Sequence, residues 1–255
     1  MACYSVTRIA VVSVMFLACS VAAGCSAMYC GVSRPAADLK PLAPELAGFT
    51  DETVEAYLKS RPEADFPCTP AIAKLGSASG ADFAGHGEYE MRMMESEEAE
   101  GWRKLVTKEG TPASPVEDVH FITPMLSGAH PDLKRLRHVA AMLHAPILLV
   151  YIEACNSDEG RNAAAMGYWT IVGLFVVPGH TVGHHSVCQA LLVDTRTGLI
   201  LATAEGDAKR EENVLPGAVE IAARRVERRS RAEAVAGLQA DVIDGLRTLA
   251  TNARK

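Results

Sequence analysis

The sequence predicts an α/β or α+β protein, with a mixed sheet of about six strands and helices packed against it, behind an N-terminal signal peptide and a tether. Continuous apolar runs such as ILLVYIEA at 147–154 are typical of strands that are buried on both faces. Segments with apolar residues at helical spacing alternate with these runs. Of the 255 residues, 49% are hydrophobic and 22% are charged, so the chain can bury a sizeable core.

The first half of the folded part is predicted to alternate between helices and short strands. Thr50 or Asp51 can cap the first helix. The elements expected after it are a strand at 70–76, a helix at 91–106, a strand at 116–122 and a helix that Pro131 opens. The strand at 116–122, VEDVHFI, alternates apolar and polar residues, as expected when one face of a strand is buried.

The second half is predicted to hold most of the sheet. Its apolar runs predict strands at 147–154, 167–177, 186–194 and 199–204, followed by a long helix. Asp194 and Gly198 bound the connection between the last two strands, and this pair of residues suits a tight hairpin with a bulge. The apolar face of the long helix consists of Val235, Leu238, Val242, Leu246 and Leu249.

Residues 1–24 are predicted to be a lipoprotein signal peptide. One positive charge, Arg8, precedes an apolar run of about fifteen residues, which fits the core of a signal peptide and is short for a membrane span. The run ends in Ala-Ala-Gly before Cys25, and small residues before a cysteine resemble a bacterial lipobox. We therefore expect Cys25 to be lipidated, with palmitate as the acyl group, and to become the mature N-terminus. Cys19 is a poorer competitor, and a plain secretory signal or an uncleaved anchor is the alternative.

The rest of the chain divides into a tether and one domain. Residues 25–48 are rich in proline and alanine and show little periodicity, as expected for an extended tether. No second linker of this kind follows, so residues 49–250 are predicted to form a single globular α/β domain. The formal net charge is −6 and becomes −7 when the signal peptide with Arg8 is removed. A mildly acidic protein is a poor candidate for nucleic-acid binding, so no nucleic-acid partner is expected.

Four cysteines follow Cys25, and an even number permits disulfides in an oxidising compartment. Cys155 and Cys188 fall on neighbouring strand candidates, so they could form a disulfide or be two core thiols. The chain carries no GxSxG, P-loop or GxGxxG motif in a suitable context. We therefore expect no cofactor.

The stretch PGHTVGHH at 178–185 is the strongest candidate for a metal site. His180 and His184 have the spacing of zincin ligands, but that spacing requires a helix, and the glycines and flanking strands argue against one. We expect a solvated hairpin loop. The alternative is a metal-binding lipoprotein in which His180, His184 and His185 together hold zinc, copper or nickel.

Acidic residues form the other candidate site. Glu153, Asp158 and Glu159 are expected to cluster near the end of the strand at 147–154. Paired carboxylates can do acid–base work when their pKa values differ, so a hydrolase is a second alternative. More commonly, acids that follow a strand are solvated loop residues, and this is the prediction here.

Two segments carry a resemblance to a known family. GYWTIVGLFVVPG at 167–179, followed by LLVDTRTGLILATAEG at 191–206, resembles the bacterial rhombotarget lipoproteins, and the resemblance covers roughly residues 115–250. The order of elements is also similar, at the level of fold alone, to the penicillin-binding-protein activator and curli-secretion lipoproteins. The family name suggests a link to a rhomboid-type protease, which would require a hydrophobic C-terminal tail, whereas this chain ends LRTLATNARK. The resemblance implies a fold and an envelope lipoprotein, and it implies no reaction.

These observations predict a non-enzymatic bacterial envelope lipoprotein that acts through protein–protein contacts. Its expected partners are the membrane, through the lipid anchor, and an unidentified envelope protein. In lipoproteins of diderm bacteria, an aspartate after the lipidated cysteine favours retention in the inner membrane. Ser26 stands at that position here, so resemblance to such lipoproteins implies the periplasmic face of the outer membrane.

Overall fold

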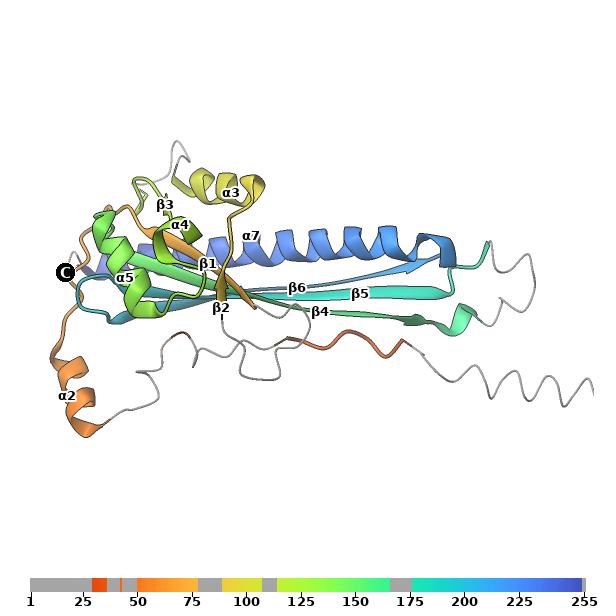
Figure 1. Ribbon diagram of the computed structural model, residues 1–255, viewed down its shortest axis with the longest axis horizontal. Coiled ribbons are helices and arrows are strands. Elements are labelled where there is room, and N and C mark those ends of the chain that lie inside the picture. Colours follow the sequence, from red (N-terminus) through yellow and green to blue (C-terminus); the bar gives the residue numbers. More distant parts are fainter. Residues whose placement is uncertain are drawn as a thin grey trace, which may run out of the picture. The chain divides into compact units, whose positions relative to one another are not determined.

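The computed structural model describes residues 29–35, 42, 50–77, 89–106, 114–165 and 176–253 (Figure 1). Its elements are α2 (Asp51–Lys59), β1 (Ala71–Ser77), β2 (Tyr89–Met91), α3 (Ser96–Val106), β3 (His120–Phe121), α4 (Pro124–Ser127), α5 (Leu133–Met142), β4 (Ile147–Arg161), β5 (His180–Asp194), β6 (Ile200–Val214), a 3₁₀ turn (Pro216–Ala218) and α7 (Val219–Ala253). Among the described residues, no helix is both long enough and apolar enough to span a bilayer.

The described residues fall into two compact units. The small unit comprises those within 1–32, 157–183 and 211–226, and the large unit comprises those within 33–156, 184–210 and 227–255. The long elements β4, β5, β6 and α7 contribute to both units. The expectation of one domain over 49–250 stays a prediction.

Within the described residues, six strands form one mixed sheet, as the sequence predicts. Their order is β2-β1-β4-β5-β6, and β3 pairs with β1 as well. Strand β1 is parallel to β4, with Ala71 opposite Leu148 and Gly76 opposite Glu153. It is also parallel to β3 and antiparallel to β2. A short turn joins β5 to β6, and only an antiparallel pair can be joined by so few residues.

Helices pack on both faces of the sheet in the large unit. Alternate residues of β4 point to opposite faces, because side chains alternate along a strand. One set, including Leu148 and Val150, packs with Leu136 of α5. The other set, including Leu149, packs with Leu238 of α7 and with Trp102 of α3. The continuous apolar run of β4 is therefore explained by burial on both faces.

Two local signals place elements where the sequence predicts them. The Asp132 carboxylate accepts the backbone N–H of Arg135 at 2.7 Å and so caps α5 at its N-terminus. In the β5–β6 turn, the Asp194 carboxylate accepts the backbone N–H of Thr197 at 2.9 Å, and Gly198 adopts φ +80°. The predicted hairpin chemistry is therefore confirmed.

Other boundaries differ from the prediction. Helix α3 begins at Ser96, because the residues at 89–91 form β2. Strand β6 continues ten residues past the predicted end at 204, through a charged segment. This is possible because β6 lies at the end of the strand order, where alternate positions such as Asp207 and Lys209 point away from the core. Of the predicted strand at 167–177, only Val176 and Val177 lie within the described residues.

The predicted tether differs from expectation where it is described. In the small unit, the Tyr29 backbone N–H donates to the Arg161 carbonyl at 2.9 Å. In the large unit, Arg34 pairs with Asp207 at 2.9 Å and also with Glu205. The segment 29–35 is therefore bound to strands and does not extend freely. Cys25 and the signal peptide lie outside the described residues, so both stay predictions.

Candidate functional site

The most unusual feature of the large unit is a group of charged side chains buried on the α7 face of the sheet. Its members are Lys74 of β1, Glu98 of α3, Glu153 of β4 and Arg231 of α7. The Lys74, Glu98 and Glu153 side chains are only 7–9% exposed, and Arg231 is 38% exposed. Charged residues are rarely this buried unless they are paired, so the group could have either a structural or a chemical role.

The strands bring these side chains together through their register. Lys74 lies opposite Tyr151 in the parallel pair of β1 and β4, and alternation directs Ile72 and Lys74 to the face that α7 covers. Tyr151 and Glu153, two residues apart on β4, point to the same face for the same reason. Trp102 of α3 packs against the Tyr151 ring, with 6.0 Å between centroids, and so holds α3 over this part of the sheet.

Every carboxylate in the group has a cation beside it. The Lys74 Nζ lies 2.6 Å from Glu98 Oε2 and 3.4 Å from Glu153 Oε2. Arg231 donates to both oxygens of Glu153, through Nε and through Nη2 at 3.1 Å. The Tyr151 hydroxyl donates to the remaining oxygen of Glu98. The arrangement around Glu153 is the two-pronged pairing that arginine and carboxylates favour.

The pairing sets the protonation states. Burial raises the pKa of Glu153, but the hydrogen bonds from Arg231 and the charge of Lys74 outweigh burial, so the pKa lies below its ordinary value. Burial lowers the pKa of Lys74, but the charges of Glu153 and Glu98 outweigh it, so the pKa is raised. Burial and the Glu98 carboxylate raise the pKa of Tyr151 well above its ordinary value. Glu153 and Lys74 are therefore ionised at neutral pH, and Tyr151 is neutral.

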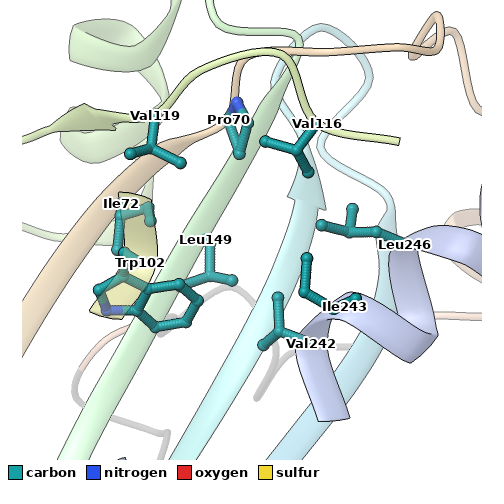
Figure 2. A pocket seen from close by; sticks show the side chains of 9 residues that line it. All are labelled: Pro70, Ile72, Trp102, Val116, Val119, Leu149, Val242, Ile243 and Leu246. Atoms are coloured by element: carbon teal, nitrogen blue, oxygen red, sulfur yellow. The ribbon is translucent and has the colours of Figure 1, made fainter. Parts of the chain in front are cut away.

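The ion pairs leave each carboxylate of the group with a cation beside it. The geometry therefore supports a structural role, in which the ion pairs hold α3 and α7 in place on the sheet. Figure 2 shows a small cavity on the same face, lined by apolar side chains from the sheet and from α3 and α7, including Ile72, Trp102, Leu149 and Ile243. Its volume is about 10 Å³, which is roughly what one water molecule needs.

The histidines do not form a hairpin loop. His180, His184 and His185 lie on β5, and His184 and His185 are buried. The prediction of a solvated loop is wrong, because β5 begins at His180 and includes Gly183 and all three histidines. At Gly183, a Cβ would lie 2.0 Å from the Tyr29 hydroxyl, so a larger residue here would displace the Tyr29 side chain.

The alternative metal site is not assembled either. His184 and His185 are adjacent on a strand, so their imidazoles point to opposite faces. His184 Nδ1 lies 3.2 Å from the Ser186 hydroxyl, whereas His185 Nε2 lies 2.8 Å from Asp207. Within the part of the chain that the structure describes, no three His, Cys, Asp or Glu side chains are grouped as metal ligands.

The predicted acidic cluster is also wrong. Glu153, Asp158 and Glu159 lie on one continuous strand, because β4 extends to Arg161 and not only to residue 154. Asp158 is five residues from Glu153 along extended chain, so the two carboxylates cannot share a proton. Glu153 is buried in ion pairs and is not solvated, and this removes the geometric basis of the hydrolase alternative.

The candidate disulfide is absent, and Cys155 and Cys188 are both free thiols. Cys188 is buried in the same cluster as Tyr151, whereas Cys155 lies four residues farther along β4 and is exposed. The alternative expectation of two core thiols therefore holds for Cys188 and is wrong for Cys155.

Sequence reasoning missed most of the buried charged group. A signal existed for Lys74, which interrupts the apolar strand AIAKLG, and for Glu153, which interrupts ILLVYIEA. A charge inside such a run indicates a buried partner of opposite sign. No comparable signal marks Glu98 or Arg231, because both lie in helices that are rich in charged residues.

Comparisons with known proteins give only remote similarities. No protein-family model matches the chain, and no curated protein matches it. A dodecamer of a PelC variant from Paraburkholderia phytofirmans is similar at a TM-score of 0.34 and 11% identity, over 74% of this chain and 95% of that one. The lipoprotein GNA1162 from Neisseria meningitidis is similar at a TM-score of 0.29 and 10% identity, over 63% and 95%.

A third solved structure is similar to the same degree. Protein XCC0632 from Xanthomonas campestris, of the family DUF330, has a TM-score of 0.34 and 10% identity, over 77% of this chain and 95% of that one. At these values, structural similarity establishes neither a family nor a function. The resemblance to rhombotarget lipoproteins therefore stays a prediction.

Proposed function

We propose that the chain is a bacterial envelope lipoprotein, anchored by acyl chains on Cys25, that acts through protein–protein contacts and not through catalysis. The observation that carries this proposal is the sequence Ala22-Ala23-Gly24-Cys25 at the end of an apolar run of about fifteen residues. Two or three acyl chains on one cysteine give stable anchoring, whereas a single chain gives only marginal membrane binding.

Two structural observations support the proposal. The Tyr29 backbone, only four positions after Cys25, bonds to Arg161 of the folded part. An acylated Cys25 would therefore lie close in sequence to a residue that is held on the fold. In the large unit, the buried carboxylates Glu98 and Glu153 are engaged by Lys74 and Arg231. Carboxylates engaged in this way are not available for acid–base chemistry on a substrate, which supports a role without catalysis.

Metabolic labelling with an alkyne analogue of palmitate tests the anchor. We expect the wild-type protein to incorporate the label and Cys25→Ser to lose it completely. Cys19→Ser is the matched control, since Cys19 lies in the same apolar segment and should retain full labelling. Labelling that survives Cys25→Ser, or that is lost in Cys19→Ser, would contradict attachment at Cys25.

The proposed location is the periplasmic face of the outer membrane, and it is supported by the absence of aspartate after Cys25. In a diderm host, the wild-type protein should co-sediment with outer-membrane markers on a density gradient. Ser26→Asp should move it to the inner-membrane fraction without changing its acylation. Wild-type protein in the inner-membrane fraction would contradict this location.

The protein–protein part of the proposal is tested by crosslinking in intact cells. A short amine-reactive crosslinker should capture one or a few envelope proteins reproducibly with the wild-type protein. Capture should fall when Cys25→Ser prevents anchoring, because the partner is then no longer met at the membrane surface. Crosslinked products that are equally abundant with an unrelated lipoprotein would contradict specific contact.

A further inference from the structure

Figure 1 shows the ends of β4 and β6 beside the starts of β5 and α7, in the small unit. Large apolar side chains near these ends are exposed. Val176 is 69% exposed, Leu215 is 38% exposed and Ile221 is 66% exposed. Single exposed apolar residues are common on proteins, but several that gather at one end of a unit indicate a contact surface.

Side-chain hydrogen bonds tie two of these positions together. Asn162, next to the end of β4, donates to the Pro178 carbonyl at 3.0 Å and to the Asn213 side chain at 3.2 Å. Val176 lies two residues before Pro178, and Leu215 lies two residues after Asn213. Val176 and Leu215 therefore each lie two residues from a hydrogen-bond partner of Asn162.

The packing of α7 brings Ile221 to the same end of the small unit. Ala222 of α7 is buried with Val182 of β5 and Val214 of β6, and these residues form the apolar core of the small unit within its described part. Ile221 is the neighbour of Ala222 on the helix and points outward. The core is small, so the unit leaves much of its large apolar surface outside.

The N-terminal segment is fixed beside this end. Tyr29 bonds to Arg161, the last residue of β4. Its side chain lies beside Glu211 of β6, and burial together with that carboxylate raises the pKa of Tyr29 to about 12. Cys25 lies four positions before Tyr29 in the sequence, and four extended residues span at most about 14 Å. Leu215 lies the same number of residues beyond Glu211.

We propose that this end of the small unit, carrying Val176, Leu215 and Ile221, lies against the bilayer in which Cys25 is anchored. The inference rests on the lipidation of Cys25 proposed above. Acyl chains on Cys25 would hold Tyr29 within about 14 Å of the lipid headgroups, so the surface around Tyr29 would lie close to the bilayer. Apolar side chains at such a surface are stabilised when the interface removes them from water.

The charges of the small unit define the kind of contact. Its described residues carry five carboxylates and three guanidinium groups, so this surface does not attract anionic lipids. The contact is therefore with the boundary between headgroups and acyl chains, and not with headgroup charge. It should persist at high salt, which screens contacts between exposed charges.

Photocrosslinking in the full, lipidated chain tests this surface. Photoreactive benzoylphenylalanine replaces Ile221, Leu215 or Val176 in separate variants that are expressed in cells and irradiated. Met142 on α5 is the control position, because its apolar side chain is 67% exposed, as much as that of Ile221. We expect peptides of lipid-adduct mass at 176, 215 and 221, several-fold above the yield at 142 and unchanged by high salt.

The other outcomes overturn the inference. An adduct of twice the protein's mass would assign the surface to a second copy of the chain, and an adduct to another protein would assign it to that protein. Yields at 176, 215 and 221 equal to the yield at 142 would mean that the surface faces water. The mass of the Cys25 peptide in the same digest separates the two proposals. Acylated Cys25 without lipid adducts refutes only the surface, and lipid adducts with unmodified Cys25 refute only the anchor.

Discussion

Side chains alternate between the two faces of a strand, so neighbouring polar residues meet different partners. His184 and His185 are neighbours, yet His184 faces Ser186 and α7, whereas His185 faces Asp207 on the opposite side. The same alternation places Lys74 and Glu153 under α7. A loop would have left these side chains in water, so the strand assignment changes what each of them is expected to do.

His184 should make stability depend on pH. Burial lowers its pKa, with Arg231 and His185 acting in the same direction and the carboxylates of Glu227 and Glu153 opposing. The unfolded chain then binds a proton more readily than the folded chain. The contribution of His184 is therefore complete above the unfolded pKa of about 6.5 and is lost as the pH falls below it toward the folded value.

Urea unfolding followed by circular dichroism, between about pH 8 and about pH 5, measures this dependence. We expect His184→Asn to be less stable than the wild type at the higher pH and to flatten the decline below about pH 6.5. His138→Asn, which changes an exposed histidine on α5, should leave the decline unchanged. A decline of equal slope in His184→Asn would show that other groups carry it.

Arg231 should contribute to stability through the buried charged group. Arg231→Met leaves the Glu153 carboxylate buried with only Lys74 beside it, at 3.4 Å. Removing one partner of a buried pair typically costs about 3 kcal/mol. Arg247→Met is the matched control on the same helix, because the pair of Arg247 with Asp244 is exposed and should contribute less than about 1 kcal/mol. Equal losses in urea unfolding would contradict a structural role for the buried pair.

For individual helices and strands, the sequence predicts the type of an element better than its first and last residues. Helix α5 and strand β1 begin within two residues of their predicted starts, because a capping aspartate and a short apolar run are local signals. The lengths of β5 and β6 were underestimated, since charged and glycine-containing segments enter a sheet through pairing with neighbouring strands. Such pairing is tertiary and leaves no local signal.

For the candidate site too, local signals could be predicted from the sequence and tertiary contacts could not. The sequence singles out Glu153 and the histidines, but it predicts solvated loops for both, because their burial depends on how far β4 and β5 extend. The partners of Glu153 come from α7 and β1, which are distant in the chain. Periodicity cannot identify contacts of this kind, and charge inside an apolar strand was the nearest available signal.

The contact of β6 with α7 should depend on Gly206. A Cβ at this position would lie 1.9 Å from the Ala234 carbonyl oxygen and 2.5 Å from the Leu238 nitrogen, both of them backbone atoms. Gly206→Ala should therefore force the helix away and cost about 2–3 kcal/mol of unfolding free energy.

Gly245→Ala on α7 is the control, because its Cβ would lie 3.8 Å from the Ala202 side chain, an ordinary contact. This change should stabilise the protein by about 0.5–1 kcal/mol, since alanine favours a helix. Both free energies come from urea unfolding followed at the helical circular dichroism signal. No loss in Gly206→Ala would contradict close packing of β6 on α7.

For the whole molecule, the segment that follows the proposed anchor is bound to the folded part. The sequence predicts a tether at 25–48, yet Tyr29 and Arg34 already bond to strands. These contacts could not be predicted, because a proline-containing segment without periodicity reads as a linker whether or not it docks. An anchor at Cys25, as proposed above, would therefore hold the small unit near the bilayer.

The mass of the mature N-terminal peptide tests attachment at Cys25 most directly. Protein extracted from membranes with detergent is digested, and the peptide that carries Cys25 is measured by mass spectrometry. We expect the mature chain to begin at Cys25 and its thiol to carry a diacylglyceryl group. An N-terminus at any other residue, or an unmodified Cys25 within an intact Gly24–Ser26 sequence, would contradict it.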